Sequence, residues 1–316
     1  MKRSLTVLLW LAAVSAAYSQ VIEDDWIFSV AYIDNESTGA GGTGFFVSRE
    51  FETNKNLVFL VSNKHVLAPK DLSPGETNRL ATAKVVITRE ENGQLTTGVL
   101  DITLREPDGT RRVVTHPNSN IDVAVIDVTS DVVENGGVRK GFKVGWVRED
   151  RFATLQTITN THVTIGQQVV FLGYPLNLIE GKTAIAVARG GFVATPPERD
   201  FKSRPVFLVD SATIRGSSGS PVFLPLRTGK IEMQPNGNRT VDVMHGYTPC
   251  LLGIVAETIP DWELVVKRTD TYGLEPSAVS VISTANFGIV FRAEEISETL
   301  DATHTPRVQG HGQTEF

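Results

Sequence analysis

The sequence is almost free of cysteine, since Cys250 is the one cysteine among 316 residues. A single cysteine cannot form an internal disulfide, which excludes the small secreted scaffolds that depend on several disulfides. Cys250 stands before the apolar run Leu251-Leu252-Gly253, a setting typical of a buried small side chain rather than of a reactive thiol. We therefore expect the stability of the fold to come from a hydrophobic core.

The chain also lacks a basic cluster and a long apolar run. It has 30 basic and 36 acidic residues and a net charge of −6, so nucleic acid is not an expected partner. Beyond the N-terminal segment no run approaches the roughly 20 apolar residues that a membrane span needs. We expect no membrane span in the mature chain, and neither a cofactor nor a metal ion. The sequence leaves the oligomeric state open.

The first 19 residues have the pattern of an export signal. Lys2 and Arg3 precede the apolar stretch Leu5 to Val14, and Ala17-Tyr18-Ser19 provides small residues for cleavage. An uncleaved membrane anchor is the alternative interpretation. The pattern predicts an exported protein, either periplasmic or extracellular.

Helical periodicity is scarce, and short runs rich in Val, Ile and Phe alternate with turn residues. This spacing predicts an all-β fold built as a sandwich or barrel. The strands are expected over residues 44–47, 57–62, 84–88, 99–104, 123–128, 169–172, 183–187, 206–209, 251–255 and 288–291. One helix is expected over 293–300, because acidic residues occupy its first turn. We expect a surface loop over 226–246 and a disordered tail over 301–316.

The strongest functional signal is Gly216-Ser217-Ser218-Gly219-Ser220-Pro221. A serine with glycines two residues before it and one residue after it can lie on a tight turn with its hydroxyl exposed. Backbone N–H groups of the same turn can then converge on a negatively charged oxygen. Acyl transfer needs this combination of a nucleophile and an oxyanion hole.

A base and a carboxylate are expected elsewhere in the chain. His65 follows the apolar run Val58 to Ser62, and Asp122 stands at the start of another apolar strand. A carboxylate in such a place can orient an imidazole through its Nδ1–H group. Asp127, at the far end of the same strand, is the rival candidate. Taken singly, either residue could be an ordinary structural histidine or a solvated aspartate.

The order and spacing of these three motifs resemble those of the chymotrypsin-type serine proteases, and more closely of their bacterial HtrA/Do-like branch. The resemblance rests on Ser62-Asn63-Lys64-His65-Val66, on Asp122-Val123-Ala124-Val125 and on residues 210–221. It covers roughly residues 27 to 300.

The resemblance implies two packed six-stranded antiparallel β-barrels followed by a short C-terminal helix. The N-terminal barrel would span residues 20–150 and carry His65 and Asp122. The C-terminal barrel and the helix, which would pack against it, would span 151–300 and carry Ser218. The implied activity is hydrolysis of protein or peptide substrates through an acyl-enzyme, with Gly216, Ser217 and Ser218 forming the oxyanion hole.

The sequence departs from this family pattern in several places. Arg215 stands where the branch usually has proline, Ser220 replaces a glycine, and residues 226–246 form an insertion. The PDZ domains common in the branch are not expected here. Ala212 should form the base of an uncharged primary specificity pocket, and we assign Arg215 and Ile254 to substrate binding as well.

Two other functions remain open. The chain could be a catalytically silent or zymogen-like binding module on the same fold, because a fold does not by itself provide an activity. It could also be an esterase, although the esterase nucleophile motif has its second glycine two residues after the serine.

Overall fold

The computed structural model describes residues 19–35, 40–53, 55–68, 82–135, 137–160, 163–177, 183–211, 216–233, 239–243, 249–266 and 278–303. In the N-terminal half the elements are β1 (Ser19–Val21), α1 (Asp24–Ile27), β2 (Val30–Asn35), β3 (Ala40–Glu52), β4 (Lys55–Ser62), α2 (Lys64–Leu67), β5 (Thr82–Glu91), β6 (Gln94–Thr103), β7 (Val114–Thr115), β8 (Ala124–Asp127), α3 (Thr129–Val132), β9 (Val133–Glu134), β10 (Gly137–Val138), β11 (Val147–Arg148) and η1 (Glu149–Arg151).

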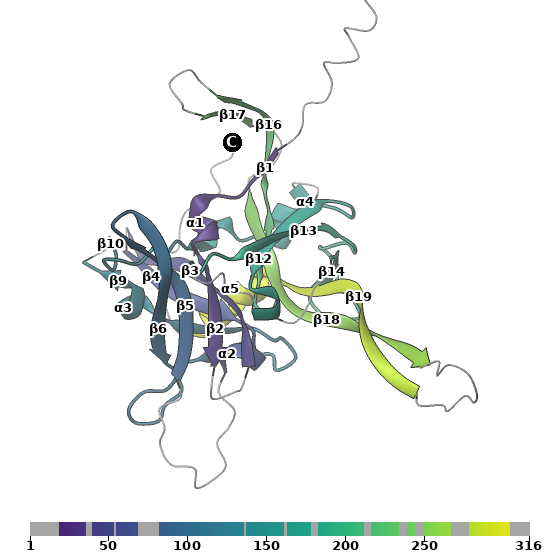
Figure 1. Cartoon of the computed structure of the whole chain (residues 1–316), viewed down its shortest axis with the longest axis horizontal. Coiled ribbons are helices and arrows are strands. Elements are labelled where there is room, and N and C mark those ends of the chain that lie inside the picture. Colours follow the sequence, from purple (N-terminus) through teal and green to yellow (C-terminus); the bar gives the residue numbers. More distant parts are fainter. Residues whose placement is uncertain are drawn as a thin grey trace, which may run out of the picture.

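The C-terminal half continues with α4 (Leu155–Asn160), β12 (Gln168–Gly173), η2 (Pro175–Asn177), β13 (Val187–Val193), β14 (Val206–Asp210), β15 (Pro221–Leu224), β16 (Leu226–Met233), β17 (Arg239–Val243), β18 (Cys250–Val266), β19 (Ala278–Arg292) and α5 (Ala293–Asp301). Figure 1 shows the two halves side by side.

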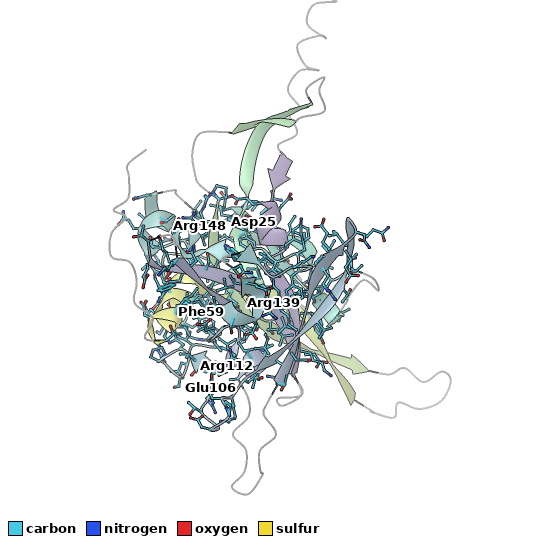
Figure 2. The ribbon with its side chains drawn as sticks, turned by 90° about the vertical axis from the view of Figure 1, so that its left-hand side faces the viewer. Asp25, Phe59, Glu106, Arg112, Arg139 and Arg148 are labelled. Carbon is cyan, nitrogen blue, oxygen red and sulfur yellow. The ribbon has the colours of Figure 1, made fainter. Side chains whose placement is uncertain are left out.

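A large sheet forms the N-terminal half. Its strands follow the order β6-β5-β2-β3-β4-β8-β7, with β11 paired to β3. Side chains alternate between the two faces of a strand, and here both faces are apolar. Phe45 and Phe59 belong to one core cluster, whereas Phe46 and Leu60 belong to another on the opposite face. Figure 2 shows Phe59 inside the body of the molecule.

A closed barrel forms the C-terminal half. Its strands follow the order β12-β13-β14-β19-β18-β15. Inward-facing residues of these strands, among them Phe171, Phe207 and Leu252, form a third core cluster. The fold class prediction is therefore confirmed: the protein is mostly β, with a closed six-stranded barrel, a second large antiparallel sheet and a C-terminal helix. Among the described residues the hydrogen-bonded path of the N-terminal half is a sheet of eight strands rather than a closed ring of six.

The N-terminal segment packs on the C-terminal barrel. Trp26 of α1 is 2% exposed, and its ring stacks on Phe223 of β15 with a centroid distance of 4.5 Å. Both residues belong to the cluster that also contains Phe59 of the sheet. One apolar core is therefore shared between the two halves.

The C-terminal helix reaches back to the N-terminal sheet. It contacts β18 and β19 of the second barrel, as expected, and it also contacts β7 and β8 of the sheet. Arg49 of β3, which is fully buried, makes a bidentate hydrogen bond to the Glu149 carboxylate and donates to the Ser297 carbonyl. Its Nη1 lies 3.0 Å from Asp301 Oδ1, an ion pair without good hydrogen-bond alignment.

Residues 226–246, expected to be a surface loop, contain two strands instead. β16 pairs with β17, and β1 pairs with the other edge of β16. The alternation in Thr240-Val241-Asp242-Val243 and the Asn236-Gly237 pair are hairpin signals. The many glycine and charged residues of the segment outweighed those signals in the prediction.

The strand expected over 183–187 was also placed wrongly, because β13 begins only at Val187. Residues 183–186 instead cross to the N-terminal sheet, where the Ala184 carbonyl accepts hydrogen bonds from Thr88 Oγ1 and the Tyr174 hydroxyl. These bonds replace the expected strand ladder.

β18 and β19 continue past the barrel as a long two-stranded hairpin that points away from the body (Figure 1). The predicted export signal lies outside the described residues except for Ser19, and the predicted tail lies outside them from residue 304 onward. Within the described ranges, no helix has the length and apolar character to cross a membrane.

Candidate active site

His65 is placed by the end of a buried strand. β4 ends at Ser62, Asn63 follows in extended conformation, and the one-turn helix α2 then carries His65. The side-chain amide of Asn63 donates a 2.7 Å hydrogen bond to the backbone carbonyl of Asp122. This bond joins the start of α2 to the segment before β8. The local sequence thus fixes the two segments that carry the predicted base and carboxylate.

Asp122 binds His65 at two points. Its Oδ2 lies 2.6 Å from His65 Nδ1, and its Oδ1 accepts the His65 backbone N–H at 3.2 Å. Because an ionised carboxylate can only accept, the Nδ1 atom carries the proton. Nε2 of the neutral ring is therefore an unprotonated base. The imidazole is 49% exposed and the carboxylate 20% exposed, so the base can reach solvent while its partner is partly covered.

The ionised form of Asp122 is favoured. Burial on its own would raise the pKa of this carboxyl, but hydrogen bonds from the His65 side chain and from the backbone N–H groups of His65 and Lys64, together with the electrostatic attraction of the His65 ring, outweigh it. The net result is a lowered pKa. Asp122 is thus held as the anion that orients the imidazole and can stabilise its charged form.

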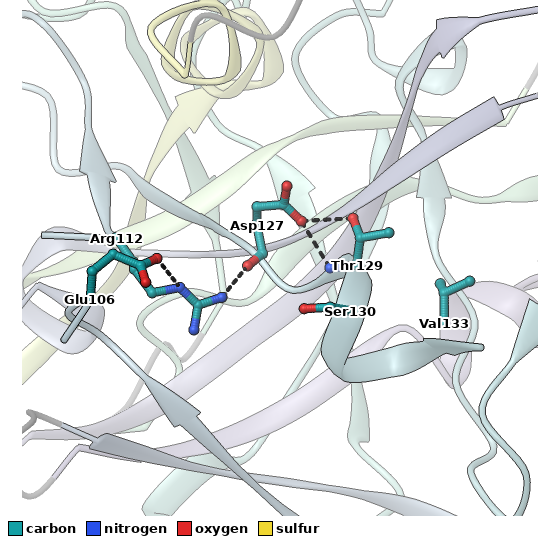
Figure 3. Close-up of a pocket in the computed structure, with 6 residues that line it drawn as sticks. All are labelled: Glu106, Arg112, Asp127, Thr129, Ser130 and Val133. Carbon is teal, nitrogen blue, oxygen red and sulfur yellow. Dashed lines mark hydrogen bonds and ion pairs between the residues drawn. The ribbon is translucent and has the colours of Figure 1, made fainter.

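Asp127, the rival carboxylate, has a local structural role. Its Oδ1 accepts hydrogen bonds from the backbone N–H and the hydroxyl of Thr129, at the start of α3 (Figure 3). It lies at the rim of a pocket whose other lining residues are Glu106, Arg112, Thr129, Ser130 and Val133. Figure 3 shows Arg112 bridging the Glu106 carboxylate and the Asp127 carbonyl. Asp127 is thus committed to a helix start, and Asp122 is the carboxylate that pairs with a histidine.

Ser218 lies on a tight turn just before β15. Gly216 and Gly219 have φ values of +89° and +86°, a region that favours glycine. A Cβ on Gly219 would lie 1.8 Å from the Thr43 carbonyl oxygen, so no other residue fits there without moving β3. Both glycines of the predicted motif are therefore required by the backbone.

Every carbonyl from residue 216 to 218 has a hydrogen-bond donor. Gly216 O accepts from Thr43 Oγ1, Ser217 O from the Ser220 N–H, and Ser218 O from the Thr43 N–H. In a trans peptide the N–H points away from the carbonyl, so the Ser218 N–H points away from Ser220. No acceptor within the described residues binds it. The turn can therefore present this N–H to an oxyanion.

The Ser218 hydroxyl is partly buried and donates a 3.3 Å hydrogen bond to the Ala256 carbonyl of β18. Among the described contacts it makes no hydrogen bond to His65. The turn and α2 are nevertheless neighbours: a Cβ built on Gly42 would lie 3.1 Å from the Ser218 carbonyl oxygen and 2.9 Å from a Val66 methyl carbon. Gly42 of β3 thus lies between the serine turn and the residue that follows His65.

The remaining predicted site residues differ in their placement. Ser217 is buried, with 3% of its surface exposed. Ile254 is fully buried among core residues, so its side chain is not placed to contact a substrate from solvent. Ala212 and Arg215 lie outside the described residues. The structure thus brings His65 and Asp122 together, places the Ser218 turn next to α2 and corrects the assignment of Ile254 to substrate binding.

Sequence reasoning missed Thr43 and Ala256. Ala256 contributes a backbone carbonyl, for which no sequence signal exists. Thr43 belongs to the glycine-rich run Gly41-Gly42-Thr43-Gly44, directly before the apolar residues of β3. A polar residue among glycines at a strand start could have marked a close approach between two segments.

One further cluster has the residue types of a metal site. His116 Nε2 lies 3.3 Å from a carboxylate oxygen of Glu295 and 3.3 Å from one of Glu298. However, His116 Nδ1 accepts the Asn118 backbone N–H at 2.9 Å. A neutral ring then carries its proton on Nε2, which occupies the lone pair that a metal would need. The residues present therefore fit a shared proton better than a metal ion.

Cys250 is confirmed as a buried residue. Burial raises the pKa of its thiol to about 12, so at neutral pH it is not a thiolate nucleophile.

The geometry agrees with a comparison against known families. The model of the trypsin-like peptidase domain matches residues 42–231, a span that contains His65, Asp122 and Ser218. No curated protein matches the chain. Because the matched span covers more than half of the 316 residues, this chain belongs to the trypsin-like peptidase domain family.

Proposed function

We propose that the chain is an exported serine endopeptidase that cleaves protein or peptide substrates through an acyl-enzyme. The observation that carries the proposal is the 2.6 Å His65–Asp122 contact beside a serine turn whose carbonyl groups are all hydrogen-bonded. The export part rests on the residues of the N-terminal segment alone. The motifs around His65, Asp122 and Ser218 support membership of the HtrA/Do-like branch.

Each residue has a role in this proposal. Ser218 Oγ attacks the substrate carbonyl, and His65 Nε2 takes its proton and later delivers it to the leaving amine. Asp122 keeps the proton of the neutral ring on Nδ1 and stabilises the imidazolium that forms. The Ser218 N–H, together with the Gly216 N–H, binds the oxyanion, and one good donor is worth roughly 3–4 kcal/mol.

We also propose that the two halves divide near residue 150. The support is that β11 still pairs with β3 of the N-terminal sheet, whereas Ala153 already donates its N–H to the Leu251 carbonyl of the barrel. η1 (Glu149–Arg151) then connects the half that carries His65 to the half that carries Ser218.

A fluorophosphonate probe tests the activity, because it reacts with an activated serine. We expect the wild-type protein to be labelled and the Ser218→Ala and His65→Ala variants to remain unlabelled. Digestion of casein by the wild type alone would distinguish a peptidase from an esterase. If the wild type stays unlabelled between pH 7 and pH 9, the hydroxyl is held by Ala256 and the chain is the silent binding module instead.

A further inference from the structure

Thr43 reaches from the N-terminal sheet into the serine turn of the other half. The residue is fully buried on β3. Its backbone N–H donates to the Ser218 carbonyl at 2.9 Å, and its hydroxyl donates to the Gly216 carbonyl at 2.9 Å. The same hydroxyl accepts the Tyr174 N–H at 3.1 Å. One residue thus holds the peptide groups on both sides of the nucleophile.

The direction of the hydroxyl proton follows from these contacts. A threonine hydroxyl has one proton and two lone pairs. The Tyr174 N–H occupies a lone pair, so the single proton is available for Gly216 O. Ser62 adds a further restraint, because its hydroxyl donates a 2.7 Å hydrogen bond to the Thr43 carbonyl and so fixes the backbone of β3 at this point.

These contacts restrict the orientation of the Ser218 N–H. Peptide groups are planar, so the chain between residues 216 and 219 can reorient only by rotating whole peptide units. Thr43 hydrogen-bonds the Gly216–Ser217 peptide group and the Ser218–Gly219 peptide group, which flank the Ser217–Ser218 peptide. The middle unit carries the Ser218 N–H, and it cannot rotate independently while both neighbours are fixed.

We infer that Thr43 is a positioning residue for the oxyanion hole. Its hydroxyl acts across the interface between the two halves. The inference deepens the proposed peptidase function and rests on it. Thr43 does not touch the substrate. It keeps the Ser218 N–H directed at the place where negative charge develops, so its loss should lower kcat more than it raises KM.

The test compares Thr43→Val with Thr43→Ser. Valine keeps the branched shape and the backbone N–H, but it leaves Gly216 O and the Tyr174 N–H without the hydroxyl. We expect Thr43→Val to react with the fluorophosphonate about tenfold to a hundredfold more slowly and to lose a similar factor in kcat on a peptide substrate, with KM changed less than about threefold. Thr43→Ser, which keeps the hydroxyl, should recover most of the rate.

Thr88→Val is the matched control. Thr88 is also a buried strand threonine whose hydroxyl bridges the two halves, through the Ala184 carbonyl at 3.0 Å, but among the described contacts this hydroxyl makes no hydrogen bond to residues 216–219. We expect this variant to lower Tm by about as much as Thr43→Val and to keep the wild-type labelling rate. Equal labelling of Thr43→Val and wild type, or an equal loss in Thr88→Val, would overturn the inference.

Hydrogen exchange separates this inference from the proposed function. The amides of residues 216–220 should exchange faster in Thr43→Val than in the wild type or in Thr88→Val. This readout needs no catalysis. An unlabelled wild type would refute the peptidase proposal, whereas unchanged exchange in Thr43→Val would refute the role of Thr43.

Discussion

Gly219, directly after the nucleophile, shows how closely the two halves approach each other. Its φ of +86° already favours glycine, and the Thr43 carbonyl oxygen and Ser62 Oγ would lie 1.8 Å and 2.6 Å from an added Cβ. β3 and the last residue of β4, the strand that leads into α2, therefore lie against the turn that carries Ser218. The site therefore depends on the missing side chain of Gly219 as well as on its reactive groups, because any larger residue would push β3 away from the turn.

Ser220 illustrates the opposite case, a polar group without a partner. It is fully buried, and its Oγ has no hydrogen-bond partner among the described residues. Its backbone bonds to Val255 and Ser217 remain in any substitution. We expect Ser220→Ala to be neutral or to stabilise the fold by up to about 1 kcal/mol, because a buried unpaired hydroxyl is costly. Urea unfolding measures the change.

The labelling rate provides the second half of this test. Ser220→Ala should keep the wild-type rate with a fluorophosphonate, since the turn is held by other groups. A loss of stability above about 1 kcal/mol would mean that the hydroxyl has a partner in solution, such as a bound water.

The predicted reactive residues could be found in the sequence, but the residue that holds the serine turn in place could not. Ser218 was selected from its glycine turn, and His65 and Asp122 from their places beside apolar runs together with the order and spacing of the three motifs. Thr43 could not be selected on the same basis. Its hydroxyl meets a carbonyl 173 residues later in the chain, a contact that no local pattern encodes.

At the scale of elements, α5 is held to the N-terminal sheet by a buried arginine. Arg49 makes the bidentate contact to Glu149 and meets the helix at Ser297 and Asp301. We expect Arg49→Ala to cost about 3–5 kcal/mol of unfolding free energy, because it leaves a partly buried Glu149 carboxylate without its partner. Arg49→Lys should recover less than half, since lysine cannot form the paired hydrogen bonds.

A double variant checks the cause of that loss. Arg49→Ala combined with Glu149→Gln also removes the carboxylate charge that Arg49 neutralised, so it should be less destabilising than the sum of the two single changes. Additive losses in thermal unfolding would contradict the proposed ion pair.

The same helix also carries a titrating group. Burial, with the nearby Glu298, Glu294 and Asp200 carboxylates, raises the pKa of Glu295 to about 7, against the opposing effect of Arg292. In the unfolded chain a glutamate titrates near 4.3. Folding therefore loses stability as pH rises from about 4.3 to 7, by at most about 1.4 kcal/mol per pH unit for one proton. We expect Glu295→Gln to remove this slope.

Thermal unfolding between pH 5 and pH 8 measures the effect. The Tm of the wild type minus that of Glu295→Gln should fall across this range. His116 acts in the opposite direction, because burial lowers its pKa and stability is lost as pH falls through its unfolded value. His116 Nε2 lies 3.3 Å from a Glu295 oxygen, so Glu295→Gln changes this contribution too, and the comparison is therefore made with His116→Asn present in both proteins. A difference that rises with pH would contradict the assignment.

The elements themselves were predicted unevenly. Nine of the ten expected strands fall on observed strands, because Val, Ile and Phe runs mark a buried sheet. The segment 183–187 contains Ile185 and Val187, but its Ala184 carbonyl binds Thr88 in the other half of the molecule. β16 and β17 were missed because glycine and charge are also typical of loops. The composition of a segment indicates whether it is buried. It does not indicate which segment provides its hydrogen-bond partners, because those partners can be distant in the sequence.

For the described part of the molecule, the first and the last helix both pack across the boundary between the halves. Trp26, near the N-terminus, stacks on Phe223 of the barrel, and α5, at the other end, packs on the sheet. We therefore expect a single unfolding transition, with equal calorimetric and van't Hoff enthalpies. Trp26→Ala should lower stability by roughly 3–5 kcal/mol.

Leu155→Ala provides an exposed control for this prediction. Leu155 of α4 is 38% exposed, and its truncation should cost far less than that of Trp26. Two resolved transitions in the wild-type protein would show that the halves unfold independently and would contradict the role given to these two helices.

The buried Arg49 also has a consequence for the order of events during synthesis. The ribosome releases Arg49 long before Ser297, which lies 248 residues later. Until then the guanidinium group has its Glu149 partner but lacks the Ser297 and Asp301 contacts, so the packing of α5 on the N-terminal sheet is incomplete. The contact between Arg49 and α5 can therefore form only after the last described helix has emerged, which makes it one of the last long-range contacts to form in a newly made chain.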